Sequence, residues 1–328
     1  MEYRTLGKNG PKISEVGLGC WQLGGDWGDP LSEETGLGIL QEAVKQGVTL
    51  FDTADVYGGG KSESLIGTFL KTEKKPLTII SKFGRGNGVY PDNYSEKVLF
   101  ESVENSLERL GLNSLDLIQL HCVPQEILVD GAIFTWLRKL KDQGLVKNFG
   151  ASIETIEQGL ICMKHEDLLS LQVIFNIFRQ RVVTELLPKA LETGTGIIVR
   201  LPLASGLLSG AYNASTRFSE NDHRNYNRDG QAFNVGETFA GLEFNKGLEI
   251  VDILKKEYLP KDLPMAQYAL RWILDHPAVS CVIPGASKVE QVRSNAAASS
   301  LAPLGDRTHD ALYELYQNDI DQYIRGAY

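Results

Sequence analysis

Short apolar runs alternate with longer helical patterns along almost the whole chain, and this alternation constrains the fold more than any other feature. Strands that alternate with helices pair in parallel through right-handed crossovers. Eight such units close into a barrel with its helices outside. We therefore expect an α/β fold, a (β/α)8 TIM barrel. The eight candidate strands are residues 16–18, 48–51, 77–80, 115–120, 146–151, 171–175, 196–199 and 279–283.

Local signals mark the ends of several elements. The Lys-Asn-Gly-Pro turn at residues 8–11 predicts an N-terminal β-hairpin before the first barrel strand. Ser32 can cap a helix that ends at Gly47, and Ser95 can cap a second helix that stops at Gly111. The second helix carries its leucines and valine on one stripe, which indicates a face packed against a sheet.

A length of 328 residues also suits two average domains, and an open doubly wound sheet is the alternative to a barrel. We find no linker or internal repeat that divides the chain. Gly17 and Gly19 lie at the first strand, but Gln22 stands where the third glycine of the dinucleotide fingerprint belongs. The sequence therefore predicts a single barrel domain over residues 1–328.

Charge and cysteine spacing argue against several classes of partner. The chain has 42 acidic and 33 basic residues, so its net charge of −9 disfavours nucleic acid and anionic membranes. No apolar stretch approaches the roughly 20 residues that span a bilayer. The cysteines show no disulfide or metal-binding spacing. We expect a cytoplasmic location and no metal site. The cysteines are Cys20, Cys122, Cys162 and Cys281.

Residues 204–246 interrupt the regular alternation after the seventh candidate strand. The segment is rich in Gly, Asn, Asp and aromatic residues, and loops of this length usually have a function. In a barrel it would lie on the face that carries active sites, where it could fold over a ligand. The alternatives are a surface excursion or an oligomer contact, and the sequence leaves the oligomeric state open.

Polar residues, most of them ionisable, appear where the apolar runs finish. Asp52, Lys82, His121, Asn176 and Arg200 each end or directly follow a candidate strand. In a barrel these ends converge at one mouth. The second, third and fourth strands thus present a carboxylate, an ammonium and an imidazole as neighbours.

A tyrosine five residues after Asp52 adds a phenol to this group. Lys82 would lower the pKa of Tyr57, and Asp52 would keep Lys82 charged. His121 could donate a hydrogen bond to a substrate oxygen. Each residue also has a structural interpretation: an ion pair, a buried histidine, a loop aromatic. Their conjunction favours carbonyl reduction, in which a hydride reaches carbon and a proton reaches oxygen.

Four motifs together resemble the aldo-keto reductase superfamily over essentially the whole chain. They are Asp52-Thr53-Ala54-x-x-Tyr57-Gly58, Ser81-Lys82, the Asp-Leu-Ile-Gln-Leu-His of residues 116–121, and residues 203–210. The resemblance implies a (β/α)8 barrel and a catalytic tetrad of Asp52, Tyr57, Lys82 and His121, with Tyr57 as general acid. It also implies a nicotinamide dinucleotide held in an extended conformation.

The same resemblance assigns residues to the cofactor. Ser152 and Gln172 would hold the nicotinamide amide, and Arg200 stands where many members stack an aromatic ring on it. The charge of Arg200 would favour the reduced cofactor. Lys288 could receive a 2′-phosphate, which favours NADP(H) over NAD(H). The assigned residues are Trp21, Asp52, Ser152, Gln172, Arg200, Leu201, Leu203, Ser205, Gly206, Leu207, Ser209, Gly285, Ser287, Lys288, Gln291 and Asn295.

The substrate is expected to be a small carbonyl compound or polyol bounded by aromatic residues. The predicted pocket residues are Trp21, Tyr57, Phe83, His121 and Cys122. The sequence favours an NADP-dependent reductase of aldehydes or ketones. The alternatives are a sugar or cyclitol dehydrogenase that works in the oxidative direction, and a cofactor-binding regulatory subunit like the channel-associated β relatives.

Overall fold

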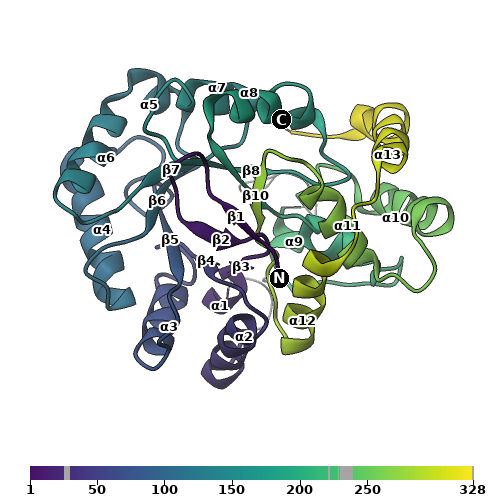
Figure 1. Cartoon of the computed structure of the whole chain (residues 1–328), viewed down its shortest axis with the longest axis horizontal. Coiled ribbons are helices and arrows are strands. Elements are labelled where there is room, and N and C mark those ends of the chain that lie inside the picture. The colour runs from purple at the N-terminus through teal and green to yellow at the C-terminus, as the bar shows by residue number, and fades with distance from the viewer. Residues whose placement is uncertain (26–29, 221, 228, 230–238, 327–328) are drawn as a thin grey trace.

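The computed structural model describes residues 1–25, 30–220, 222–227, 229 and 239–326, and its centre is a curled sheet of eight parallel strands (Figure 1). All eight candidate strands are present, in the sheet order β10-β9-β8-β7-β6-β5-β4-β3. They are β3 (Leu18–Gly19), β4 (Leu50–Asp52), β5 (Thr78–Phe83), β6 (Leu117–His121), β7 (Phe149–Ser152), β8 (Ser170–Ile174), β9 (Gly196–Arg200) and β10 (Val279–Val282).

The first and last strands meet, so the sheet closes into the predicted barrel. Parallel bridges join Val16 to Val282 and Gly19 to Gly285. The backbone N–H of Gly17 donates to the carbonyl of Val282 at 2.8 Å. A closed barrel directs the carboxyl ends of all its strands to one face.

An N-terminal hairpin lies across one end of this barrel (Figure 1). It pairs β1 (Tyr3–Thr5) with β2 (Lys12–Ser14) in antiparallel fashion, which confirms the turn predicted at residues 8–11. Leu6 and Ile13 are fully buried and belong to one apolar cluster with Leu50, which begins β4. The hairpin therefore fills the barrel from the amino-terminal ends of the strands.

Helices surround the sheet. They are α1 (Trp21–Gly24), α2 (Glu33–Lys45), α3 (Lys61–Leu70), α4 (Glu96–Leu110), α5 (Gln125–Asp130), α6 (Ala132–Asp142), α7 (Ile156–Cys162), α8 (Leu186–Thr193), α9 (His223–Tyr226), α10 (Phe244–Ile253), α11 (Met265–Leu274), α12 (Val289–Ala297) and α13 (Asp306–Asp319). Segments of 3-10 helix span Arg181–Val183, Ala204–Ser209 (η2), Ala298–Ser300 and Asp321–Tyr323, and a π-helical turn spans Leu254–Tyr258. Within the described ranges, no helix is both long and apolar enough to cross a bilayer.

The capping signals read from the sequence act as predicted. The Ser32 hydroxyl accepts from the backbone N–H of Thr35 at the start of α2. Ser95 does the same for α4, which ends at Gly111 in the left-handed conformation (φ +66°). Glycine tolerates this conformation without the steric cost of a Cβ. The apolar stripe of α4 is buried and packs into the core through Leu99, Val103, Leu107 and Leu110.

The segment after β9 is less irregular than the sequence suggests. Residues 204–246 contain η2 and α9, and α10 begins at Phe244. Residues 221, 228 and 230–238 of this segment lie outside the described part of the chain. Its described residues return to the carboxyl face of the barrel, where several of them line a cavity.

Candidate active site

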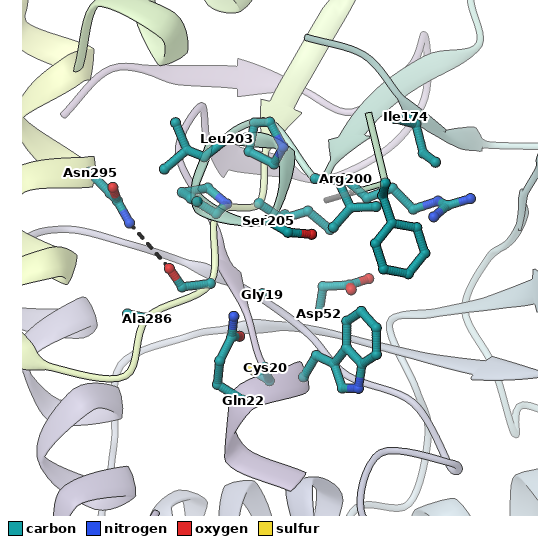
Figure 2. Close-up of a pocket in the computed structure, with 18 of the residues that line it drawn as sticks. Gly19, Cys20, Gln22, Asp52, Ile174, Arg200, Leu203, Ser205, Ala286 and Asn295 are labelled. Atoms are coloured by element: carbon teal, nitrogen blue, oxygen red, sulfur yellow. Dashed lines mark hydrogen bonds between the residues drawn. The ribbon is translucent and has the colours of Figure 1, made fainter. Parts of the chain in front are cut away.

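A cavity of about 1460 Å³ opens at the carboxyl ends of the barrel strands. It extends from Asp52 and Arg200 on one side to Ala286 and Asn295 on the other (Figure 2). The strand register places side chains from neighbouring strands together there, because His121 is level with Ser152 and Ser152 with Gln172. The predicted convergence of strand ends is therefore present.

Lys82 is the centre of a buried polar cluster beneath the cavity. Its Nζ lies 2.6 Å from Oδ2 of Asp52, 2.7 Å from the carbonyl oxygen of Thr53 and 3.4 Å from the Tyr57 hydroxyl. Lys82 and Asp52 are almost wholly inaccessible to solvent. A buried ion pair is stable only when hydrogen bonds also satisfy its remaining polar atoms. Here Thr53 and Tyr57 supply those partners for the ammonium.

The second oxygen of Asp52 is held by Gln172. The amide nitrogen of Gln172 donates to Oδ1 of Asp52 at 2.7 Å and to Oε1 of Gln119 at 2.9 Å. The Ser152 hydroxyl donates to the Gln172 carbonyl oxygen at 3.4 Å. Residues from four strands thus fix the orientation of the Asp52 carboxylate.

The charge states of the cluster follow from burial and neighbouring charge. Burial opposes the charged form of Lys82, but the Asp52 carboxylate holds the pKa of this lysine above its ordinary value. Burial raises the pKa of the Tyr57 phenol, and Lys82 opposes that rise without overcoming it. The charge of Lys82 thus lowers the pKa of Tyr57, as expected from the sequence, but desolvation raises that pKa by more. The phenol is held protonated beside an ammonium ion.

His121 faces the same part of the cavity. Its ring packs edge-on against Tyr57 with 6.0 Å between centroids. Burial lowers its pKa well below the ordinary value, and the charges of Lys82, Arg200 and Arg85 lower it further. Among the described residues, Nδ1 of His121 has no hydrogen-bond partner. A neutral imidazole here can donate a hydrogen bond to a ligand oxygen.

An aromatic wall closes one side of the cavity. Trp21 stacks on Tyr57 with ring centroids 5.9 Å apart and an interplanar angle of 18°. Phe239 packs edge-on against Trp21 at 5.9 Å, and His223 lies 5.2 Å from the same ring. Trp21 was predicted here, whereas Phe239 and His223 come from the long segment after β9.

Arg200 projects from the end of β9 toward the strand ends (Figure 2). Its Nη2 donates to the carbonyl of Ile153 at 3.2 Å and lies 3.6 Å from Sγ of Cys122. Nε of Arg200 is buried and has no partner among the described residues. Arg200 also lines the cavity, so its guanidinium borders the space that a ligand would occupy.

The η2 segment forms a left-handed turn beside the cavity. Ala204, Ser205 and Gly206 have positive φ angles of 45°, 51° and 93°. A Cβ at Gly206 would meet the Tyr212 hydroxyl, and the φ of +93° is one that side-chain-bearing residues rarely adopt, so both favour glycine here. Positive φ is costly for non-glycine residues, and successive turns of this kind gather backbone amides into anion-binding concavities.

The start of α12 forms the other end of the cavity. Oε1 of Gln291 accepts from the backbone N–H of Ser287 at 2.7 Å and from that of Lys288 at 3.2 Å. The Asn295 amide donates to the carbonyl of Gly285 at 3.4 Å, shown as the dashed line in Figure 2. Gln291 and Asn295 thus order the loop that precedes the helix.

Most of the predicted site residues line the cavity. The lining set includes Trp21, Asp52, Tyr57, His121, Cys122, Gln172, Arg200, Leu201, Leu203, Ser205, Gly206, Ser209, Gly285, Ser287, Gln291 and Asn295. Their assignment to cofactor, substrate or catalysis stays a prediction.

Five predicted residues lie behind the cavity wall or away from it. Lys82 lies under Asp52 and Tyr57, and Ser152 lies behind Gln172. Phe83 is fully buried because consecutive strand residues point to opposite faces, so it packs toward Tyr94 outside the barrel. Leu207 is buried in the core, and the side chain of Lys288 is exposed.

Sequence reasoning missed several charged and aromatic residues of the wall. They lie in loops a few residues beyond the strand ends or in the long segment, where no periodic pattern marks them. The clearest sequence signal was the Arg and aromatic content of residues 204–246. The missed residues include Arg85, Tyr90, Glu154, Arg179, Tyr212, Arg224 and Phe239.

Comparison with known proteins places the chain in a family. The model of the Aldo/keto reductase family matches residues 15–317. An uncharacterized oxidoreductase of Bacillus subtilis, YqkF, is 31% identical over 330 residues, with 98% of each chain covered. The chain belongs to the aldo/keto reductase family and is an oxidoreductase by that membership.

Solved structures and a plant relative extend this comparison. The holo form of an aldo-keto reductase from Bacillus halodurans matches with a TM-score of 0.77 at 26% identity, covering 99% of this chain and 100% of that one. A glycerol dehydrogenase from Gluconobacter oxydans matches with a TM-score of 0.80 at 26% identity, covering 99% and 98%. A probable voltage-gated potassium channel subunit beta of Arabidopsis thaliana is 29% identical, with 93% of each chain covered.

The cysteines and acidic residues form no metal centre in the described part of the chain. No group of three or more His, Cys, Asp or Glu side chains is placed there to hold an ion. All four cysteines are buried thiols.

Proposed function

We propose that this protein reduces an aldehyde or ketone to the alcohol with NADPH, and that Tyr57 donates the proton. The observation that carries this proposal is the contact of the Tyr57 hydroxyl with the buried Lys82–Asp52 pair, beside a neutral His121. A proton donor and a hydrogen-bond donor thus border the same part of the cavity.

The cavity suits a dinucleotide. Its volume is about 1460 Å³, and a left-handed turn at η2 and a helix start at α12 border it. Both are features that bind phosphate groups. The buried Nε of Arg200 lacks a partner among the described residues, and Arg200, Gln172 and Asn295 all line the cavity. We propose that these residues hold an extended nicotinamide dinucleotide, which when bound in reduced form supplies the hydride.

In this mechanism Tyr57 delivers its proton to the carbonyl oxygen of the substrate. The Lys82 ammonium stabilises the phenolate that remains, and Asp52 keeps Lys82 charged and in place. His121 donates a hydrogen bond to the same oxygen and thereby orients the carbonyl. Trp21 and the other aromatic residues exclude water from the reacting atoms.

The same residues support the oxidative direction, because proton transfer through Tyr57 is reversible. The similarity to a glycerol dehydrogenase favours a polyol or sugar substrate for that direction. A regulatory-subunit role is supported by the names of two plant relatives, both probable voltage-gated potassium channel subunits beta. The polar cluster around Lys82 favours an enzyme over that role.

Arg200 would set the preference between cofactor redox states. A guanidinium beside the nicotinamide disfavours the cationic, oxidised ring. We expect the wild type to bind the reduced form more tightly than the oxidised form. Arg200→Met should reduce that difference when both dissociation constants are measured by fluorescence titration, and an unchanged ratio would contradict this role.

NADP specificity, the cytoplasmic location and the single-domain organisation remain proposals. Lys288 precedes α12 with an exposed side chain, from which it can reach a phosphate at the cavity rim. The experiment that tests the function is a parallel screen of aldehydes and polyols with NAD(H) and NADP(H). We expect turnover of 4-nitrobenzaldehyde with NADPH, and no turnover in either direction with either cofactor would refute an enzymatic role.

A further inference from the structure

Tyr57 is the one residue of the predicted tetrad that does not lie on a barrel strand. Asp52, Lys82 and His121 belong to β4, β5 and β6, so the pairing of these strands fixes their relative positions. Tyr57 lies in the turn between β4 and α3, which begins at Lys61. Contacts outside the sheet must therefore hold its hydroxyl beside Lys82.

The start of α3 supplies one set of these contacts through Ser62, which is fully buried. The backbone N–H of Ser62 donates to the carbonyl of Tyr57 at 3.3 Å. The Ser62 hydroxyl accepts from that of Thr53 and donates to the carbonyl of Cys20, both at 2.8 Å. Because the Thr53 carbonyl also accepts from Lys82, Ser62 connects the start of α3 to the β4 side of the polar cluster.

Glu63 makes the matching contact with β5. Its side chain is fully buried, and Oε1 accepts from the Ser81 hydroxyl at 2.5 Å. Ser81 directly precedes Lys82 in β5, so its side chain points out of the barrel while that of Lys82 points into it. Glu63 therefore connects the helix that follows Tyr57 to the strand that carries Lys82.

Arg109 compensates the charge of this buried carboxylate. Its Nε lies 2.6 Å from Oε2 of Glu63, and its Nη2 donates to the Ser106 hydroxyl at 3.2 Å. A buried carboxylate is costly without such partners. Hydrogen bonds to a carboxylate are stronger and more directional than apolar contacts, so they restrict movement of α3 against β5 more closely.

We propose that Glu63 is a positioning residue for Tyr57: its hydrogen bond with Ser81 holds the start of α3 against β5 and keeps the Tyr57 hydroxyl within reach of Lys82. The inference rests on the proposed function, because Tyr57 must be the proton donor for its position to affect turnover. The distance of 3.4 Å from Lys82 Nζ to the Tyr57 hydroxyl is already long for a hydrogen bond. A further displacement of about 1 Å would remove the contact and can lower a rate by about 100-fold.

The competing account is that the loop holds Tyr57 without Glu63. The backbone of Gly58 packs against α1, where a Cβ on Gly24 would lie 2.6 Å from the Gly58 nitrogen. Trp21 also stacks on the Tyr57 ring. On this account Glu63 contributes to stability alone, and loss of its contact with β5 leaves turnover unchanged.

Ser81→Ala tests the contact directly, because it breaks the link to β5 and leaves Glu63 paired with Arg109. With 4-nitrobenzaldehyde and NADPH, we expect kcat to fall by about tenfold or more. Ser81 is fully buried and is not among the described residues that line the cavity. KM for the aldehyde and the dissociation constant for NADPH should therefore stay within about twofold of wild type. An unchanged kcat would overturn the proposal.

Ser106→Ala is the matched control. Ser106 is also a buried serine, and its hydroxyl bonds to the same network through Arg109. It lies on α4, away from β5, so its removal should leave kcat within about twofold of wild type. Equal losses of kcat in Ser81→Ala and Ser106→Ala would show a general effect of disturbing the network, which would contradict the positioning role.

A double-mutant cycle separates positioning from a general disturbance of β5. In Lys82→Met the contact between the lysine and Tyr57 is already absent, so adding Ser81→Ala should change kcat by less than about twofold. A disturbance unrelated to this contact would lower kcat by the same factor in both backgrounds and would refute the inference. Values of kcat are compared only among variants whose circular dichroism at saturating NADPH matches that of the wild type.

Hydrogen exchange separates this inference from the proposed function. The Ser62 amide bonds to the Tyr57 carbonyl, so its exchange rate reports the attachment of the loop to α3 without any turnover. We expect Ser81→Ala to raise this rate by about tenfold or more and Ser106→Ala to leave it unchanged. If the wild type lacks reductase activity but this difference appears, the reductase function is wrong and the contact of Glu63 with β5 still holds the loop. If 4-nitrobenzaldehyde is reduced and Ser81→Ala changes neither kcat nor exchange, the function stands and the role of Glu63 is wrong.

Discussion

Two buried ion pairs border the same cavity and are built in different ways. Lys82 and Asp52 lie on neighbouring barrel strands, 30 residues apart in the chain, and the pairing of β4 with β5 sets their distance. Arg224 and Asp222 are two residues apart at the start of α9 and pair locally. The first pair is positioned by the backbone of the sheet, and the second by its own short segment.

Side-chain hydrogen bonds connect the second pair to the rest of the cavity wall. Nη1 of Arg224 donates to the Tyr212 hydroxyl at 2.5 Å, and that hydroxyl donates to the carbonyl of Ser205 at 3.1 Å. His223 Nε2 lies 3.2 Å from Oγ of Ser205. We propose that the barrel strands hold the reacting groups and that the segment after β9 holds the ligand. Changes in the first pair should reduce kcat, and changes in the second should raise KM for the cofactor.

Removing Lys82 should have the largest effect. Lys82→Met deprives Tyr57 of the charge that stabilises its phenolate, so kcat should fall by about 10² to 10⁴. It also leaves Asp52 buried without its partner, which should lower the free energy of unfolding by about 3–5 kcal/mol. Steady-state kinetics and urea unfolding measure the two effects.

Lys147→Met is the control for this change, because Lys147 forms an exposed ion pair with Asp116 at 2.7 Å. It should alter the free energy of unfolding by less than about 1 kcal/mol. A Lys82→Met protein that keeps wild-type kcat would show that the Lys82–Asp52 pair has no catalytic role.

The pH dependence tests the charge states of the strand-end cluster. The pKa of Tyr57 is raised above its ordinary value and that of His121 is lowered below its ordinary value. Reduction needs a protonated phenol and a neutral imidazole. Its kcat/KM should therefore stay level between about pH 6.5 and 9 and fall only when the phenol ionises at alkaline pH. A steady tenfold fall per pH unit starting at pH 7 would contradict this assignment.

Arg224→Met should have a smaller effect of a different kind. It removes the contacts with Asp222 and with Tyr212, which lines the cavity, and leaves the Lys82–Asp52 pair in place. We expect KM for NADPH to rise by roughly threefold to tenfold with kcat changed less than twofold. A kcat loss as large as that of Lys82→Met would show that the two regions are not functionally distinct.

The smallest expected effect is that of a substitution at Asp55, and it concerns the stability of the protein. Burial and the nearby Glu63 raise the pKa of Asp55 to about 6. An acid whose pKa is higher in the folded than in the unfolded state lowers the free energy of unfolding once it ionises. For Asp55 this loss grows as the pH rises from about 4 to 6, and it stays constant at higher pH. Asp55→Asn should stabilise the protein by about 1–3 kcal/mol at pH 7.5 and have little effect at pH 4.

Urea unfolding at the two pH values measures this difference. Asp310→Asn, at an exposed position of α13, should show no such pH dependence. An Asp55→Asn effect of equal size at pH 4 and pH 7.5 would show that Asp55 does not titrate as proposed.

The barrel itself could be predicted from the sequence because the spacing of apolar residues differs sharply between strands and helices. The eight apolar runs, the hairpin turn and the caps at Ser32 and Ser95 all proved correct. The convergence of Asp52 and His121 followed from the closed barrel alone, since its strand ends meet at one face.

The remaining wall of the cavity could not be predicted in this way. Arg85 and Glu154 lie in short loops. Loops lack the regular backbone repeat that determines, in a strand or helix, which way each side chain points. Phe239 and Arg224 reach the cavity through a segment whose path depends on side-chain contacts. The net pKa of Tyr57 also needed the structure, because the sequence showed the neighbouring lysine and could not show the depth of burial.

The most direct test of the central claim is Tyr57→Phe, measured for both turnover and cofactor binding. The change removes the hydroxyl and keeps the ring that stacks on Trp21. We predict that kcat for 4-nitrobenzaldehyde falls by at least about 100-fold while the dissociation constant for NADPH stays within about threefold of wild type. Near wild-type turnover in Tyr57→Phe, with NADPH still bound, would contradict the assignment of Tyr57 as proton donor.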